Sequence, residues 1–319
     1  MKKIIFALLI SFLATPAYAS DEVEDINFDY FIVPTEYQIK LVGMYMRIQD
    51  HFHKYEVDPK LNIHYGPSFD SPVVQSINEN YKHSSSFFGI KNTTLVYFNE
   101  KETNWYESRM SSLEGWYNDA WLKNNCVVNT KSTCGFASAR APHPHYYHMI
   151  GSDNKSASNW MKWIAHHETV HGFQKELGLM KDNLKMNCWI LEGQANALSL
   201  ASFIENNEIE EIRDGQIKNT LNIIPDLFKM SNSDFVRTFK NIENDRMSCL
   251  QKGVGYYIGM MIIEYMYIKY DVQVVHEMLL SIANGNSFDG ASRAYFKVSQ
   301  DDLYSNAFNY IVESLKQIP

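Results

Sequence analysis

The sequence predicts an α+β protein, with a small mixed α/β N-terminal part that includes an edge strand and a mainly helical C-terminal part. Residues 61–65 alternate in the manner of a strand, and residues 94–98 form a second strand-like run. From residue 157 onward the apolar residues recur mostly at helical spacing. We therefore expect two parts, residues 20–156 and residues 157–319.

Residues 1–19 have the pattern of a signal peptide. Lys2 and Lys3 precede an apolar stretch at 4–13, and residues 17–19 (Ala-Tyr-Ala) form a small-residue cleavage pattern. The apolar stretch is too short to cross a bilayer, so we expect an exported protein, periplasmic or secreted, without a membrane span after cleavage. Loss of the two lysines takes the net charge from −8 to −10, which disfavours nucleic acid and anionic membranes as partners.

The N-terminal part is expected to begin with a helix that lies on it. Its expected elements, in order, are a helix at 35–55, a strand at 61–65, a helix at 71–88, a strand at 94–98, a partly helical aromatic segment at 104–125 and an edge segment at 134–140.

Histidines gather in the segment 126–150, where His143, His145 and His148 surround Pro144 and two tyrosines. One interpretation is a second metal cluster. The favoured interpretation is an extended edge segment with surface histidines, because proline fits an edge strand or a loop.

The C-terminal part is expected to be a series of helices. We expect helices at 157–177 and 192–204, a break at 225–230 and a helix that starts at 233–235. A buried core helix at 253–266 and a helix at 272–283 are expected to follow, and then a turn at 284–287. A capping box at 299–302 is expected to open the last helix, which ends near residue 315.

Four cysteines are spread over both parts. In an exported protein they are expected to form two disulfides, and of the three possible pairings we favour Cys126–Cys134 with Cys188–Cys249. A cysteine metal site is disfavoured because the sequence has no C-x-x-C.

The pentapeptide His167-Glu168-x-x-His171 lies in the expected helix at 157–177. Positions i and i+4 share one helix face, so both imidazoles can point at one metal ion. Glu168 lies about 100° further round the helix, where it can reach a metal-bound water without acting as a ligand. The alternative is an amphipathic helix whose histidines make core hydrogen bonds.

Glu192 is the candidate for a third ligand. A turn-forming link at 178–183 separates the two helices, and a helix–turn–helix would return Glu192 to the histidines. Two histidines and a glutamate leave the fourth tetrahedral position open, as in a catalytic site with one Zn²⁺. Asn196, one turn after Glu192, is expected to hold His167 or His171 through the ring nitrogen that does not bind the metal.

Together, H-E-x-x-H and Trp189-x-x-Glu192-Gly193-x-Ala195 resemble the gluzincins, zinc metallopeptidases of the thermolysin and zinc-aminopeptidase kind. The resemblance implies a zincin-like helical lobe, zinc ligands at His167, His171 and Glu192, and hydrolysis of a peptide or protein substrate by a zinc-activated water with Glu168 as the general base. It also implies that Tyr256, or Tyr257 as second candidate, steadies the tetrahedral intermediate; the alternative is that both tyrosines only pack in the core.

One family feature is absent, since the exopeptidase strand G-x-M-E-N is not found and residues 134–140 contain no carboxylate. We therefore expect an endopeptidase or a narrow processing peptidase. Segment 126–150 is expected to line the cleft and to pair with the backbone of an extended substrate, with His145 or Tyr147 as possible contacts. The alternatives are an aminopeptidase without the usual motif and a non-catalytic exported zinc-binding or interaction protein.

Overall fold

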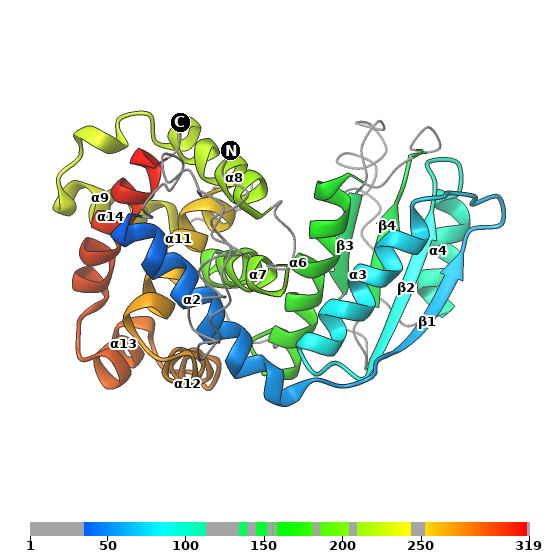
Figure 1. The fold of residues 1–319 in the computed structure, drawn as a ribbon, viewed down its shortest axis with the longest axis horizontal. Coiled ribbons are helices and arrows are strands. Elements are labelled where there is room, and N and C mark those ends of the chain that lie inside the picture. Colours follow the sequence, from blue (N-terminus) through cyan, green and yellow to red (C-terminus); the bar gives the residue numbers. More distant parts are fainter. Residues whose placement is uncertain are drawn as a thin grey trace, which may run out of the picture.

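The computed structural model of the chain describes residues 35–112, 134–138, 145–151, 155, 158–180, 186–203, 209–243 and 253–317. Its architecture is α+β and mainly helical with one small sheet, which confirms the predicted class at this level. In Figure 1 the sheet lies on one side of the molecule and most of the later helices gather on the other. The expected signal peptide at 1–19 lies outside the described residues.

The elements before residue 150 comprise a first helix, the strands of the sheet and the helices that cover the sheet. They are α2 (Glu36–Phe52), η3 (His53–Tyr55), β1 (Lys60–Tyr65), α3 (Val74–Phe87), β2 (Asn92–Phe98), α4 (Thr103–Ser112), β3 (Cys134–Ser138) and β4 (His145–Met149). The strand order is β1-β2-β4-β3, in which β1, β2 and β4 run parallel and β3 runs antiparallel to β4. β3 is therefore an edge strand, as predicted for 134–140.

Strand β4 lies inside the sheet, which corrects the expectation of an edge segment with surface histidines. It pairs with β2 on one side and with β3 on the other. His148 is fully buried, and its Nε2 is hydrogen-bonded to the hydroxyl of Tyr81 on α3. The prediction was wrong because β4 begins at His145, after the proline on which the edge interpretation rested.

The two faces of the sheet are covered by different helices. Tyr146 and His148 of β4 contact Tyr81 of α3, whereas Tyr147, one position between them, contacts Tyr106 of α4. This alternation is the period-two pattern of a strand with helices on both sides. Figure 1 shows α4 on the sheet face that is turned away from the helical half.

The elements after residue 157 are all helical. They are α6 (Asn159–Glu176), α7 (Cys188–Ser202), α8 (Ile209–Ile223), η5 (Leu227–Lys229), α9 (Asn232–Glu243), α11 (Val254–Lys269), α12 (Val272–Ala283), α13 (Phe288–Phe296) and α14 (Gln300–Lys316). The capping box at Ser299 and the buried character of α11 are confirmed. Within the described ranges, no helix combines the length and the apolar character needed to cross a bilayer.

Helix α2 packs in the helical half, which corrects the expectation that it lies on the N-terminal part. Its buried face contacts α7, α11 and α12. Tyr45 donates a hydrogen bond to Glu264 of α11 at 2.9 Å, and Arg47 donates to the carbonyl of Tyr267 at 2.9 Å. The apolar stripe predicted the helix correctly, but a stripe does not specify which surface it covers.

Helix α6 lies between two hydrophobic cores. Met161 and Ala165 pack in the core between α3 and the sheet, whereas Trp163, Val170 and Phe173 pack in the core of the helical half. Most of its residues are therefore buried, and the histidine pentapeptide is carried by one of the most enclosed helices of the protein.

Candidate metal centre

The two histidines of the pentapeptide are held on neighbouring turns of α6. Ser158 caps the helix by accepting a hydrogen bond from the backbone N–H of Met161. His167 is buried and His171 is half-buried, and their ring centroids are 4.9 Å apart. The i, i+4 spacing therefore places the two rings side by side, as the sequence predicts.

Glu192 of α7 completes a group of three. Its Oε2 lies 3.4 Å from Nε2 of His167 and 3.5 Å from Nε2 of His171. One ligand atom from each of the three residues lies within 4.8 Å of the other two, so the group could hold a metal ion. It is the one group of this kind in the part of the chain that the structure describes.

Both motif residues that flank Glu192 position α7. Trp189 is fully buried, and its indole N–H donates to Oε2 of Glu243 on α9 at 3.0 Å. Gly193 faces Gly259 of α11, where a Cβ on Gly193 would overlap the backbone of Gly259. The two glycines therefore let α7 and α11 approach closely at the turn that carries Glu192.

The electrostatics of the group favour ion pairing. Burial lowers the pKa of His171, but the carboxylates of Glu192 and Glu168 outweigh it and raise the pKa to about 9. Burial raises the pKa of Glu192, yet His171 and His167 outweigh it and hold that pKa well below its usual range. Glu192 is therefore a full anion, the form that binds a cation.

Two further predicted residues lie at this group. Glu168 is buried on α6, one residue after His167. The ring of Tyr256 stacks on that of His167 with centroids 5.8 Å apart. Burial, and then the negative charges of Glu192 and Glu168, raise the pKa of the Tyr256 hydroxyl well above its usual value. This hydroxyl therefore stays protonated at neutral pH and can donate a hydrogen bond.

The second tyrosine and the predicted orienting asparagine make other contacts. Tyr257 is hydrogen-bonded to Asn219 of α8, and burial raises its pKa. Asn196 donates through Nδ2 to the carbonyl of Tyr256 at 2.6 Å, which ties α7 to the start of α11. That Asn196 orients a ligand histidine stays a prediction.

The sequence prediction missed Gln174, the residue that contacts His171. Oε1 of Gln174 lies 2.8 Å from Nδ1 of His171, the ring nitrogen that does not face Glu192. The signal was present, since positions i and i+3 of a helix are neighbours.

The cysteines are described only in part. Cys188, the first residue of α7, is disulfide-bonded, and no cysteine among the described residues is free. Cys126 and Cys249 lie outside the described residues, so the predicted pairing stays a prediction. His143 also lies outside them, so the interpretation of a second metal cluster is untested.

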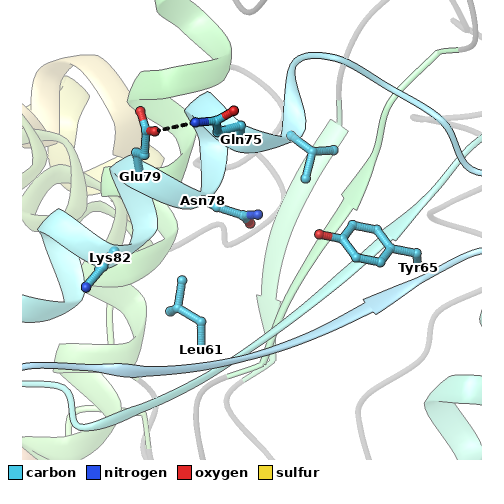
Figure 2. A pocket seen from close by; sticks show the side chains of 7 residues that line it. Leu61, Tyr65, Gln75, Asn78, Glu79 and Lys82 are labelled. Atoms are coloured by element: carbon cyan, nitrogen blue, oxygen red, sulfur yellow. Dashed lines mark hydrogen bonds between the residues drawn. The ribbon is translucent and has the colours of Figure 1, made fainter.

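A separate pocket of about 300 Å³ lies between β1 and α3 (Figure 2). Figure 2 shows Glu79 and Gln75 hydrogen-bonded to each other along one side. Its lining residues are Leu61, Tyr65, Val74, Gln75, Asn78, Glu79 and Lys82. None of them belongs to the metal-ligand group.

Comparison with known proteins gives no relative: no protein-family model, no curated protein and no solved structure matches the chain.

Proposed function

We propose that the chain is an exported zinc-dependent peptidase of the gluzincin kind. The observation that carries the proposal is the position of Glu192 Oε2, 3.4 and 3.5 Å from the two imidazole nitrogens. These distances exceed the usual length of a direct hydrogen bond, about 2.7–3.2 Å. They agree with the spacing of two ligand atoms around a tetrahedral zinc, about 3.3–3.4 Å for bonds of about 2.0–2.1 Å.

An unpaired polar atom supports a ligand at this position. Among the described residues, Oε2 of Glu192 is buried without a hydrogen-bond partner, and it lies 3.4–3.5 Å from Nε2 of the two histidines. Because buried polar atoms are nearly always paired, this oxygen supports a bound ion as its partner. Two imidazoles and one carboxylate suit zinc and leave one coordination position for a reactant.

Zinc bound there would act as a Lewis acid and lower the pKa of a bound water to about 7. In the proposal Glu168 takes a proton from the attacking water and passes it to the leaving amine. The hydroxyl of Tyr256 donates a hydrogen bond to the oxygen on which negative charge develops. Its raised pKa supports this role, because the hydroxyl keeps its proton at neutral pH.

The edge strand supports a peptide as the substrate. Strand β3 is antiparallel to β4, forms one edge of the sheet and lies against α6. An extended peptide can add to such an edge by backbone hydrogen bonds. In this proposal the sheet with α3 and α4 forms the substrate-binding lobe, and residues 157–319, with α2 packed against them, form a zincin-like lobe. The activity would be that of an endopeptidase or a narrow processing peptidase.

The substitution Glu168→Gln tests the chemistry. It keeps the size of the side chain and removes the base, so we expect peptide cleavage to fall by about 10²–10⁴-fold while zinc stays bound. The measurements are cleavage of a mixed peptide library and zinc stoichiometry by mass spectrometry. The control His171→Ala should lose both zinc and cleavage.

The outcomes separate the candidate functions. Zinc with no cleavage in the wild-type protein would favour the non-catalytic zinc-binding protein. Unchanged cleavage in zinc-loaded Glu168→Gln would overturn the role of the base. Dependence of cleavage on a free substrate amine would indicate an aminopeptidase. If the wild-type protein contains no zinc, the two histidines of the pentapeptide would be structural residues and not metal ligands.

A further inference from the structure

The contact between His171 and Gln174 leads into a longer chain of buried side chains. Gln174, Gln194 and Tyr267 are fully buried, and His276 is nearly so. They belong to α6, α7, α11 and α12 in that order. Each of them hydrogen-bonds to the next, and we call these four residues the amide relay.

The direction of the first bond is fixed by what lies on the other side of the Gln174 amide. Nε2 of Gln174 is 2.8 Å from the backbone carbonyl oxygen of Leu191, which can only accept. The atom that faces Leu191 is therefore the NH₂ group, and the atom that faces His171 is the amide oxygen. Because an amide oxygen only accepts, Nδ1 of His171 carries the hydrogen.

The later bonds have the same direction. The NH₂ group of Gln174 also donates to Oε1 of Gln194 at 3.0 Å, so Nε2 of Gln194 donates to the hydroxyl of Tyr267 at 3.2 Å. The hydroxyl accepts that bond and gives its own hydrogen to Nε2 of His276 at 3.0 Å. Burial holds the pKa of His276 at about 3, which agrees with a neutral ring that accepts.

We propose that Gln174 and Gln194 are positioning residues that fix the proton of His171 on Nδ1 and so aim its Nε2 at the metal. The inference rests on the proposed metal site and identifies how one ligand of that site is prepared. Among the described residues, Nδ1 of His167 has no hydrogen-bond partner, so His167 lacks such support there. The two histidines of the pentapeptide therefore differ, although their sequence positions look equivalent.

The substitution Gln174→Met tests the relay, since it keeps the length of the side chain and removes all three of its hydrogen bonds. We expect zinc affinity, measured by competition with a chelator, to fall by about 10–100-fold, as for partners that orient metal-bound histidines elsewhere. In zinc-loaded protein with ¹⁵N-labelled histidine, the Nδ1–H signal of His171 should lose its protection from exchange with water.

The matched control is Gln216→Met. Gln216 is a buried glutamine of α8 whose side-chain atoms have no hydrogen-bond partner. We expect its zinc affinity and the His171 signal to stay as in the wild type. A similar loss of affinity in Gln216→Met would overturn the inference, because it would show a general effect of replacing a buried amide.

A milder second variant keeps the test decisive if Gln174→Met folds poorly. Tyr267→Phe removes one hydroxyl of the relay and keeps the ring, and we expect a smaller loss of zinc affinity. Its control is Tyr97→Phe, which removes a buried hydroxyl that donates to Asn78 on α3, outside the relay. Tyr97→Phe should leave zinc affinity unchanged.

The failure of this inference differs from the failure of the proposed function. If the wild-type protein binds no zinc, both fail. If the wild type binds zinc, and Gln174→Met and Tyr267→Phe bind it equally tightly with an unchanged Nδ1–H signal, the metal site stands and the relay is overturned.

Discussion

Two clusters of charged side chains are buried in the helical half, and they are built differently. The Arg213 cluster consists of Arg213, Glu264, Tyr37, Tyr45 and Tyr310, and the metal-ligand cluster of His167, His171 and Glu192. Arg213 and Glu264 form two hydrogen bonds of 2.7 and 2.9 Å. Glu264 also accepts from Tyr45 and Tyr310, so both of its oxygens are paired.

The metal-ligand cluster has longer distances and unpaired atoms. Glu192 lies 3.4–3.5 Å from its histidines, and its side chain is 15% exposed, compared with 0% for Glu264. A cluster that satisfies itself holds the fold together, whereas one that leaves atoms unpaired at a partly open position suits a ligand. The difference teaches that a buried cluster of charges can either hold the fold together or offer ligand atoms, and that the closeness of the pairing between its charges separates the two cases.

The largest effect should come from breaking the Arg213 cluster. Arg213→Met leaves Glu264 buried without its cation, so we expect the free energy of unfolding to fall by about 3–5 kcal/mol. Urea unfolding followed by circular dichroism measures it. The double variant with Glu264→Leu should recover most of the loss, because neither charge then remains.

The free energy of unfolding of a variant in the metal-ligand cluster, measured in the same way, can be compared with that of Arg213→Met. In metal-free protein, Glu192→Gln should lower the free energy of unfolding by less than Arg213→Met does, because Glu192 is 15% exposed and lies 3.4–3.5 Å from its histidines, beyond the usual hydrogen-bond length. A loss as large as that of Arg213→Met would contradict the distinction between the two clusters.

The sequence predicted the local part of this site and left out the tertiary part. His167, Glu168 and His171 follow from helical spacing within one element, and Glu192 from the short link between two helices. Gln174 was within reach of the same reasoning, because it lies three residues after His171. These relations need only the geometry of one or two helices.

The features that the sequence did not predict depend on contacts between segments that are far apart in the chain. Nothing in the pattern of α2 indicated that Tyr45 would reach Glu264, some two hundred residues along the chain. The internal position of β4, which buries His148, likewise depends on where β3 pairs. Gly193 belongs to the sequence motif, but only the crossing of α7 and α11 shows why neither Gly193 nor Gly259 can carry a Cβ.

The crossing of α7 and α11 can be tested with a variant whose expected loss of stability is smaller than that of Arg213→Met. In Gly193→Ala the added Cβ overlaps the backbone of Gly259, which cannot move aside as a side chain could. We expect the free energy of unfolding to fall by about 1–3 kcal/mol, and zinc affinity to fall because Glu192 follows the shift of α7.

Gly215→Ala on α8 is the matched control. A Cβ at Gly215 would meet nothing within 4 Å, so alanine should stabilise the protein by about 0.5–1 kcal/mol. If both alanine variants were stabilised alike, the close approach of the two helices would not hold in solution.

The last comparison concerns buried histidines whose pKa, unlike that of His171, is lowered by burial. Burial lowers the pKa of His148 and of His276 to about 3, against about 6.5 in an unfolded chain. Between these values the unfolded state binds more protons than the folded state, so acid favours unfolding. As the pH falls from 6.5 towards 3, each histidine should lower the free energy of unfolding by up to about 1.4 kcal/mol per pH unit.

His148→Gln isolates one of these contributions. The variant removes a group that takes up a proton on unfolding, so its free energy of unfolding should fall less steeply between pH 6.5 and 4.5 than that of the wild type. Urea midpoints in metal-free protein measure the slope, because protons also compete with a metal for its ligands. An equal slope in His148→Gln and the wild type would mean that the His148 ring takes up its proton while the protein stays folded.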